Sequence, residues 1–302
     1  MKDCMFCKVK GFKVRLIMNL VAKLYQRTYD GLMMQVYKRA PKIREYKKNL
    51  TAKATRTGVI KHGVTLLCPT YKKYYYCDKD WGEGYFFRYK PVTEKGKYPV
   101  IIYLHGHGLN RAGMNNMQLF EFSWLKKNLN TKKCHQVAAH LDISCEYNRA
   151  EHSRALDGII DYIQNTYKNV DFNRIYLAGT SHGGYGCVYE VLRNPDKYAA
   201  AVISMAYTFN ELVIPPEKIR VNPFVRCLTD EDYKTLAKTP FFLSWAKNDT
   251  YNMVMSNELL LKNLQANNAN VQFKIYDDGG HTIASKFYKK PDWLKWMFEL
   301  SR

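Results

Sequence analysis

From residue 61 onward, short apolar runs alternate with stretches in which apolar residues recur every three or four positions. The unbroken runs Tyr98–Leu104 and Phe241–Ala246 are typical of strands buried on both faces of a sheet. This alternation of strands and helices predicts an α/β fold whose mostly parallel sheet is covered by helices on both faces. Strands are expected at residues 64–67, 85–89, 98–104, 136–141, 174–178, 200–205, 241–246 and 271–276, and helices at 117–127, 148–163, 184–193, 257–265 and 293–300.

A different pattern precedes residue 61. Val14, Ile17, Val21 and Leu24 recur at helical spacing with Lys and Arg residues between them, which predicts an amphipathic helix with a basic face. Residues 1–61 hold 16 Lys or Arg against three acidic residues, whereas the other 241 residues hold 31 against 24. We therefore divide the chain into a basic amphipathic helical extension at 1–60 and a globular domain at 61–302.

The basic helix has two interpretations. Its apolar side lies on an anionic membrane surface with the Lys and Arg residues near the headgroups, or it packs onto the globular domain and leaves the basic face in water. The net charge of the whole chain is +20. Because net charge alone supports only non-specific association and the sequence holds no nucleic-acid-binding motif, no specific nucleic acid is expected as a partner.

Composition excludes several classes of protein. The chain has 302 residues and is 46% hydrophobic, which is too apolar for a disordered protein. No apolar stretch is long enough to span a membrane, and the short run at residues 16–22 ends at Lys23 without a cleavage site for a secretory signal.

The eight cysteines are scattered, which indicates free thiols and a cytoplasmic location. Cys4 and Cys7 form a single CxxC without further ligands, so no metal is expected there.

The strongest chemical signal is the segment Gly179-Thr180-Ser181-His182-Gly183, between an expected strand and an expected helix. A nucleophile that projects from a sharp strand-to-helix turn has little room beside its backbone, so small residues are needed two positions before and after it. The pattern therefore indicates Ser181 as a nucleophile. The alternative is a glycine-rich turn with an incidental serine.

A serine hydroxyl needs a base to take its proton and a carboxylate to orient that base. In sheets of this kind the acid and then the histidine follow the serine along the chain, each just after a later strand. Asp249 follows the strand at 241–246, and His281 follows the strand at 271–276, so we expect both in these roles. Asp277 and Asp278 are the rival acids.

An acyl-transfer site also needs donors for the oxyanion of the tetrahedral intermediate, normally two backbone N–H groups. We expect one from His182, after the nucleophile, and the other from His107, in His105-Gly106-His107-Gly108 after the strand 98–104. The side chain of His182 is directed away from Ser181 by the turn. The remaining histidines, His62, His135, His140 and His152, are interpreted as packing or surface residues.

These residues resemble the α/β-hydrolase superfamily, and most of all its prolyl-oligopeptidase-like esterases of the feruloyl-esterase and polyhydroxybutyrate-depolymerase types. The resemblance rests on residues 99–108, 115–119, 170–186, 194–200 and 248–249, and it extends over about residues 83–300. It implies an eight-stranded, mostly parallel sheet and a hydrolase without metal or cofactor, with Ser181, Asp249 and His281 as its triad. In this branch Met often follows the nucleophile, and here that position is His182.

The sequence thus predicts a serine esterase that cleaves carboxylic esters, either small molecules or esters linked to a polysaccharide. A peptidase of the prolyl-oligopeptidase type is an alternative, although nothing upstream is long enough for a β-propeller. A second alternative is a non-catalytic protein of the same fold whose basic N-terminus binds membranes or nucleic acid. Residues 205–236 are expected to form either part of a cap over the site or local core.

Overall fold

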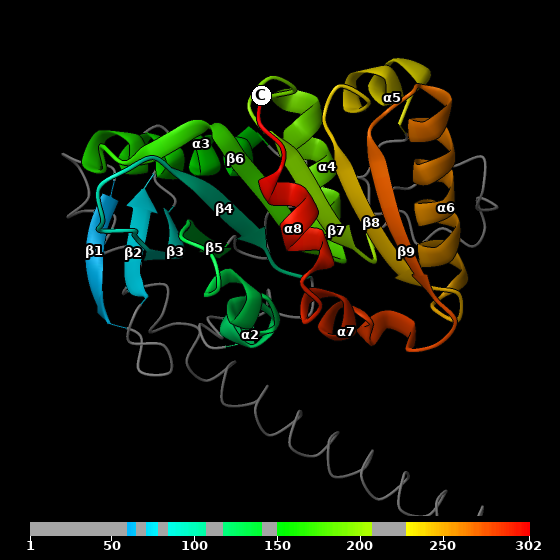
Figure 1. Cartoon of the computed structure of the whole chain (residues 1–302), viewed down its shortest axis with the longest axis horizontal. Helices are drawn as coiled ribbons and strands as arrows, with labels where there is room; N and C mark the ends of the chain where they lie inside the picture. Colours follow the sequence, from blue (N-terminus) through cyan, green and yellow to red (C-terminus); the bar gives the residue numbers. More distant parts are fainter. Residues whose placement is uncertain (1–58, 65–70, 78–83, 107–116, 141–149, 207–227) are drawn as a thin grey trace, which may run out of the picture. The chain divides into compact units, whose positions relative to one another are not determined.

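The computed structural model describes residues 59–64, 71–77, 84–106, 117–140, 150–206 and 228–302. The expected N-terminal helix, Cys4 and Cys7 therefore lie outside the described residues. Nine strands form one sheet in the order β1-β2-β3-β5-β4-β6-β7-β8-β9 (Figure 1). The strands are β1 (Val59–Val64), β2 (Lys72–Cys77), β3 (Gly84–Lys90), β4 (Tyr98–Leu104), β5 (His135–His140), β6 (Val170–Thr180), β7 (Ala200–Ser204), β8 (Phe241–Ala246) and β9 (Val271–Tyr276).

The mostly parallel sheet expected from the sequence is confirmed. The six strands from β4 to β9 pair in parallel, whereas β1, β2 and β3 pair with their neighbours in antiparallel fashion. The described sheet has nine strands, one more than the resemblance implies, and β2 was not expected. The strand expected at 64–67 shares only Val64 with β1, and its other residues lie outside the described ranges. The first strand also begins at Val59, so the domain boundary expected at residue 60 falls within β1.

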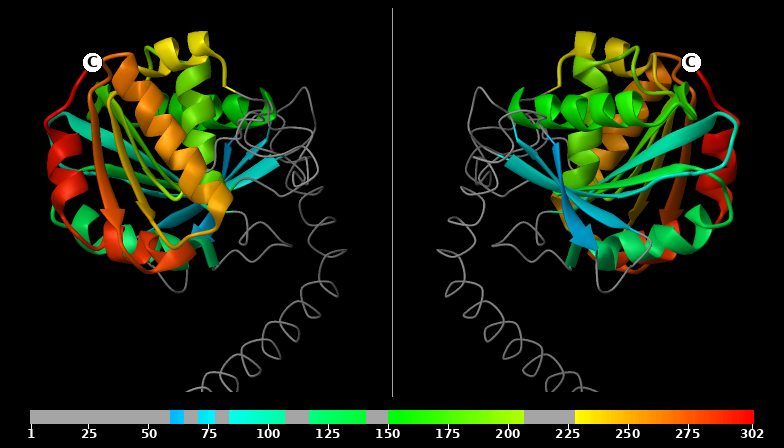
Figure 2. Two further views of the ribbon diagram at one scale, coloured as in Figure 1. Left: turned by 90° about the vertical axis from the view of Figure 1, so that its right-hand side faces the viewer. Right: turned by 90° about the vertical axis from the view of Figure 1, so that its left-hand side faces the viewer.

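Helices cover both faces of the sheet, as the two side views in Figure 2 show. Side chains alternate along β4: Val100, Ile102 and Leu104 belong to one buried cluster, and Ile101 and Tyr103 belong to the other. The first cluster includes residues of α3, α4, α5 and α6, and the second includes residues of α2, α7 and α8. These helices are α2 (Met117–Leu129), α3 (Ala150–Thr166), α4 (His182–Arg193), α5 (Asp230–Leu236), α6 (Tyr251–Ala266), α7 (Ala284–Tyr288) and α8 (Asp292–Phe298).

This layered arrangement brings the loops that carry chemistry to one edge of the sheet. Parallel strands end at the same edge, and β6, β8 and β9 are followed directly by Ser181, by the Lys247–Asp249 turn and by the loop before His281. None of the helices in the described part of the chain is long and apolar enough to cross a membrane.

Candidate active site

Ser181 is the single residue between the end of β6 at Thr180 and the start of α4 at His182. Its backbone has φ 54° and ψ −117°, a left-handed conformation that costs energy for a residue with a side chain. Two backbone hydrogen bonds hold it there: Ser181 N donates to Ser204 O at 2.8 Å, and Tyr185 N donates to Ser181 O at 3.1 Å. The sharp strand-to-helix turn expected from the sequence is therefore present.

The two flanking glycines are required by close backbone approaches. A Cβ added to Gly179 would overlap the carbonyl oxygen of Gly183, and a Cβ added to Gly183 would overlap the carbonyl oxygen of Leu104 and lie 2.7 Å from that of His105. Real Cβ atoms essentially never come so close to backbone oxygens. The turn thus presses the first residues of α4 against the end of β4.

The structure brings Ser181, His281 and Asp249 into one hydrogen-bonded row. His281 Nε2 lies 2.9 Å from Ser181 Oγ, and His281 Nδ1 lies 3.0 Å from Asp249 Oδ2. In the tautomer with the proton on Nδ1, the histidine donates to the carboxylate and its Nε2 accepts from the serine hydroxyl. The side chain of Asp249 is 1% exposed, whereas that of His281 is 42% exposed.

The loops that carry the acid and the histidine are tied together. Gly280 N donates to Asn248 Oδ1 at 2.8 Å, immediately beside both His281 and Asp249. Gly279 and Gly280 have φ values of 114° and 49°, which a residue with a side chain would adopt only under strain. Sequence reasoning missed Asn248, because nothing in its local sequence indicates a partner 32 residues away.

The rival acids lie apart from this row. Asp277 pairs with Lys247 at 2.7 Å and Asp278 pairs with Lys286 at 3.1 Å, and both carboxylates are largely exposed. The hydrogen bond from Lys247 lowers the pKa of Asp277, so this group stays ionised in its own ion pair. Asp249 is the acid that contacts His281.

One of the two expected oxyanion donors lies in the described part of the chain. His182 is the first residue of α4, so its N–H is among those with no partner inside the helix. Its ring is buried and stacks on Tyr185 at 5.8 Å between centroids. His107 lies outside the described residues, which end on this side at Gly106.

His135 is a packing residue, as expected. It is buried between Tyr89 and Tyr167, and Tyr89 Oη lies 2.5 Å from its Nδ1. Burial lowers the pKa of His135 to about 4, so the ring is neutral at physiological pH.

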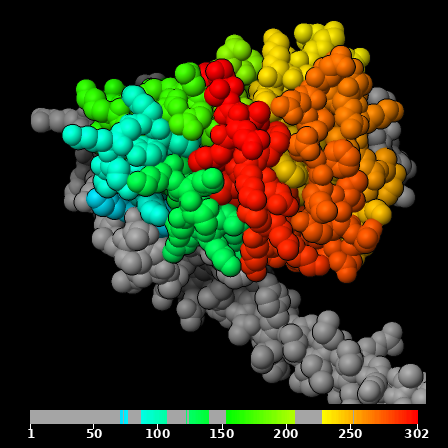
Figure 3. Space-filling model, in the orientation of Figure 1, coloured from blue at the N-terminus to red at the C-terminus, as the bar shows by residue number. Residues whose placement is uncertain are grey.

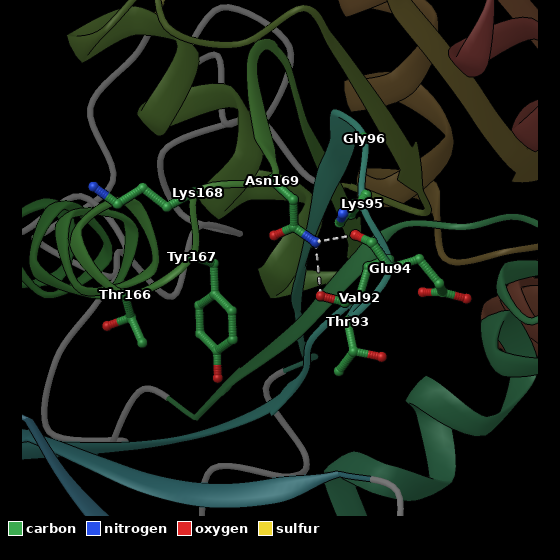
Figure 4. Close-up of a pocket in the computed structure, with 9 residues that line it drawn as sticks. All are labelled: Val92, Thr93, Glu94, Lys95, Gly96, Thr166, Tyr167, Lys168 and Asn169. Carbon is green, nitrogen blue, oxygen red and sulfur yellow. Dashed lines mark hydrogen bonds between the residues drawn. The ribbon is translucent and has the colours of Figure 1, made fainter.

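A cleft of about 490 Å³ lies at the N-terminal ends of β4 and β6, whereas Ser181 follows the C-terminal end of β6 (Figure 4). It is formed by the loop before β4 and the turn between α3 and β6. Asn169 reaches across it, and its Nδ2 donates to the carbonyl oxygens of Val92 and Glu94. Because β4 and β6 separate this cleft from Ser181, it is not the substrate cleft of the candidate active site.

The expected cap is only partly described. Residues 207–227 lie outside the described residues, whereas Leu228, Tyr233 and Leu236 at the end of the segment belong to the buried cluster with α4 and α6. This end is local core. Among the described residues, no three His, Cys, Asp or Glu side chains are grouped as a metal site would require.

No protein-family model matches the chain, and no curated protein matches it as a relative. Solved structures do match. A thermostable esterase aligns with a TM-score of 0.65 at 20% identity over 78% of this chain, and the alignment spans 64% of the esterase.

Two further structures align at 18% identity. For the acylaminoacyl peptidase of Pyrococcus horikoshii the TM-score is 0.56 over 77% of this chain and 42% of the peptidase. For an S-formylglutathione hydrolase from Staphylococcus aureus the TM-score is 0.58 over 75% of this chain and 98% of the hydrolase. Its sheet order, its serine turn and its likeness to these solved structures give the chain the α/β-hydrolase fold.

Proposed function

We propose that the protein is a serine esterase that hydrolyses carboxylic esters through an acyl-enzyme, with Ser181, His281 and Asp249 as its catalytic triad. The observation that carries the proposal is the hydrogen-bonded row of these three side chains behind a strained serine turn. A packing role would not require a left-handed backbone at Ser181 or a nearly unexposed carboxylate behind a partly exposed histidine.

The proposed reaction follows from the geometry. Ser181 Oγ attacks the ester carbonyl carbon while its proton passes to His281 Nε2, and the resulting imidazolium is stabilised by Asp249. The N–H of His182 donates to the oxyanion, and His107 is proposed as the second donor. The alcohol leaves with the proton from His281. Water then attacks the carbonyl carbon of the acyl-serine while its proton passes to His281 Nε2, and Ser181 Oγ takes that proton as the carboxylic acid leaves. No metal or cofactor takes part in these steps.

The test compares wild-type protein with Ser181→Ala and His281→Ala on a simple activated ester. We expect both variants to lose at least about 10³-fold in kcat/KM. A fluorophosphonate probe should label wild-type protein at Ser181 and leave the Ser181→Ala variant unlabelled. Full hydrolysis by the alanine variant at Ser181 would exclude the mechanism.

The substrate class is a proposal of its own. We expect small-molecule esters or esters attached to a polysaccharide, including aromatic acyl esters, by resemblance to feruloyl esterases. A peptidase is the second candidate, because the acylaminoacyl peptidase shares the fold. A panel of acyl esters of increasing chain length, aromatic acyl esters and acyl-amino-acid anilides distinguishes the two, since a peptidase would cleave the anilides at rates comparable with esters.

The N-terminal extension and the cellular location are proposed as follows. The basic extension at 1–60 is proposed to contact an anionic membrane surface, with packing onto the globular domain as the alternative and no specific nucleic acid as partner. The protein is proposed to be cytoplasmic, and the buried free thiols of Cys134 and Cys187 support a reducing compartment. Vesicle binding by full-length protein, compared with that of a variant in which Lys13, Arg15, Lys23 and Arg27 are replaced by Gln, tests the first proposal. Cell fractionation tests the second.

A further inference from the structure

The positive charge of the globular domain is concentrated on the helices of one face. The segments 117–133 and 284–302 hold nine Lys or Arg against three acidic residues, a net charge of +6. The other 205 residues after residue 61 hold 22 against 21, a net charge of +1. Apart from the N-terminal extension, nearly all of the excess charge therefore belongs to α2, α7, α8 and the residues that follow α2 and α8.

These segments pack into one continuous surface. Asn128 on α2 donates to the carbonyl oxygens of Tyr288 and Lys290 at 2.8 and 2.9 Å, which ties α2 to the end of α7. Lys132 lies over the ring of Phe298 on α8, with its Nζ 6.0 Å from the ring centroid. Figure 3 shows α2 beside α7 and α8 on the same side of the molecule.

Five exposed lysines of this surface, Lys127, Lys132, Lys289, Lys290 and Lys295, are here called the lysine patch. Two other lysines of these segments have acidic partners: Lys133 pairs with Glu94, and Lys286 pairs with Asp278. Within the described ranges of the chain, no carboxylate forms an ion pair with a lysine of the patch. The charge of the patch is therefore not neutralised by the described part of the protein itself.

The segments that carry these lysines also carry aromatic side chains, of which Phe298 lies under Lys132. Trp124 on α2 and Trp296 and Phe298 on α8 are half-buried at the border of the buried cluster. Half-buried Trp and Phe rings beside Lys cations suit a membrane interface, where the rings lie at headgroup depth and the cations meet anionic phosphates. Eight of the nine basic residues of these segments are lysines, and Lys lacks the planar fork with which Arg binds nucleic-acid phosphates and bases.

We propose that the lysine patch is a docking surface for an anionic phospholipid membrane. Charge complementarity carries the proposal: an unneutralised positive surface next to half-buried aromatic rings matches a negatively charged lipid interface. The residues of this surface belong to the globular domain and not to the N-terminal extension, and the proposal does not depend on the esterase reaction.

The test is co-sedimentation of full-length protein with phosphatidylcholine vesicles that contain either no phosphatidylserine or about 30%. The test variant replaces Lys127, Lys289, Lys290 and Lys295 with Gln. The control variant removes the same number of charges from exposed lysines on other elements, with Lys95, Lys238, Lys262 and Lys274 replaced by Gln. Both variants keep the N-terminal extension unchanged.

We expect the test variant to lose about tenfold in affinity for phosphatidylserine vesicles and the control to stay within about twofold of wild type. Salt at about 500 mM should abolish the wild-type binding. Equal losses in the two variants, or none in the test variant, would overturn the proposal, because binding would then depend on overall charge or on the extension. Tighter, patch-dependent binding to duplex DNA than to vesicles would also overturn it.

Thermal unfolding by circular dichroism checks that the variants are folded. If the test variant with four substitutions melts at a lower temperature than wild type, two smaller variants replace it. One replaces Lys127 and Lys132 with Gln, and the other replaces Lys289 and Lys290 with Gln. Each pair is then expected to lower vesicle binding at an unchanged melting temperature. If both pair variants are folded and bind phosphatidylserine vesicles as tightly as wild type, the proposal is overturned.

Discussion

At the scale of single residues, the candidate site depends on how the loop before His281 is held. Asn248 Oδ1 accepts from Gly280 N, and this bond joins the residue before the acid Asp249 to the residue before the base His281. Replacing Asn248 with Ala removes the acceptor, so the imidazole is held less closely against Ser181. Because misplacing a catalytic group by about 1 Å can cost about 100-fold, we expect kcat on an activated ester to fall about 10- to 100-fold with KM nearly unchanged.

A second link between the same two loops offers a matched control. Lys247 and Asp277 form an exposed ion pair at 2.7 Å, and exposed pairs contribute little to stability. Lys247→Ala should therefore change kcat by less than about twofold. Equal effects of the two substitutions would show that Asn248 has no particular role in positioning His281.

At the scale of elements, the contact of α4 with the end of β4 requires glycine at 183. In Gly183→Ala the new Cβ meets the carbonyl oxygens of Leu104 and His105, so the helix and Ser181 with it must move away from β4. Overpacking of this kind costs about 1–3 kcal/mol. We expect a melting temperature lower by several degrees and a loss of ester hydrolysis of about 100-fold or more.

Ser181→Ala is the control for this prediction. It removes a hydroxyl without adding an atom near β4, so it should abolish hydrolysis while the melting temperature stays close to that of wild type. A Gly183→Ala variant with wild-type melting and full activity would show that the approach of α4 to β4 is looser than the structure indicates.

At the scale of the whole molecule, folding stability should depend on the protonation of Glu190. This carboxyl is 1% exposed on α4, near Ser153 Oγ and Tyr198 Oη. Burial raises the pKa of Glu190 from 4.5 to about 7. The folded protein therefore holds this proton more tightly than the unfolded chain does. The stabilisation is fully present below pH 4.5 and is lost as pH rises to about 7, by up to about 3 kcal/mol.

Glu190→Gln removes this dependence. Relative to wild type, the variant should gain free energy of unfolding between about pH 5 and about pH 8, measured by urea denaturation at each pH. The low pKa of buried His135 works in the opposite direction, because its neutral form stabilises the fold above pH 6.5 and this is lost toward pH 4. That contribution cancels in the comparison of variant with wild type. A constant difference at all pH values would contradict the role of Glu190, with Glu299→Gln as the exposed control.

The sequence by itself determined the alternation of strands and helices in the parallel part of the sheet and the chemistry of the turn. The apolar runs at 98–104 and 241–246 match β4 and β8 to the residue, because a strand buried on both faces needs continuous apolar side chains. Gly179, Ser181 and Gly183 form a local pattern, since the steric demands of a sharp turn act within a few residues. Asp249 and His281 were expected near Ser181 from their positions after later strands.

Elements without such patterns were found only in the structure. β2 reads Lys-Lys-Tyr-Tyr-Tyr-Cys, in which both Tyr74 and Tyr75 are buried, so it shows no alternation of apolar and polar residues. α7 is five residues long, too short for a helical period to appear. α5 did have a local signal that sequence reasoning overlooked: Thr229 and Asp232 form a capping box.

Tertiary structure alone decided which groups meet. The distance between His281 and Ser181, 100 residues apart, and the bond between Asn248 and Gly280 depend on how β6, β8 and β9 lie side by side. The burial that shifts the pKa values of His135 and Glu190 and the joining of α2 to α7 and α8 into one basic surface arise in the same way. Patterns along a chain record what each segment requires of its own backbone and faces, whereas these properties depend on the neighbours that packing supplies.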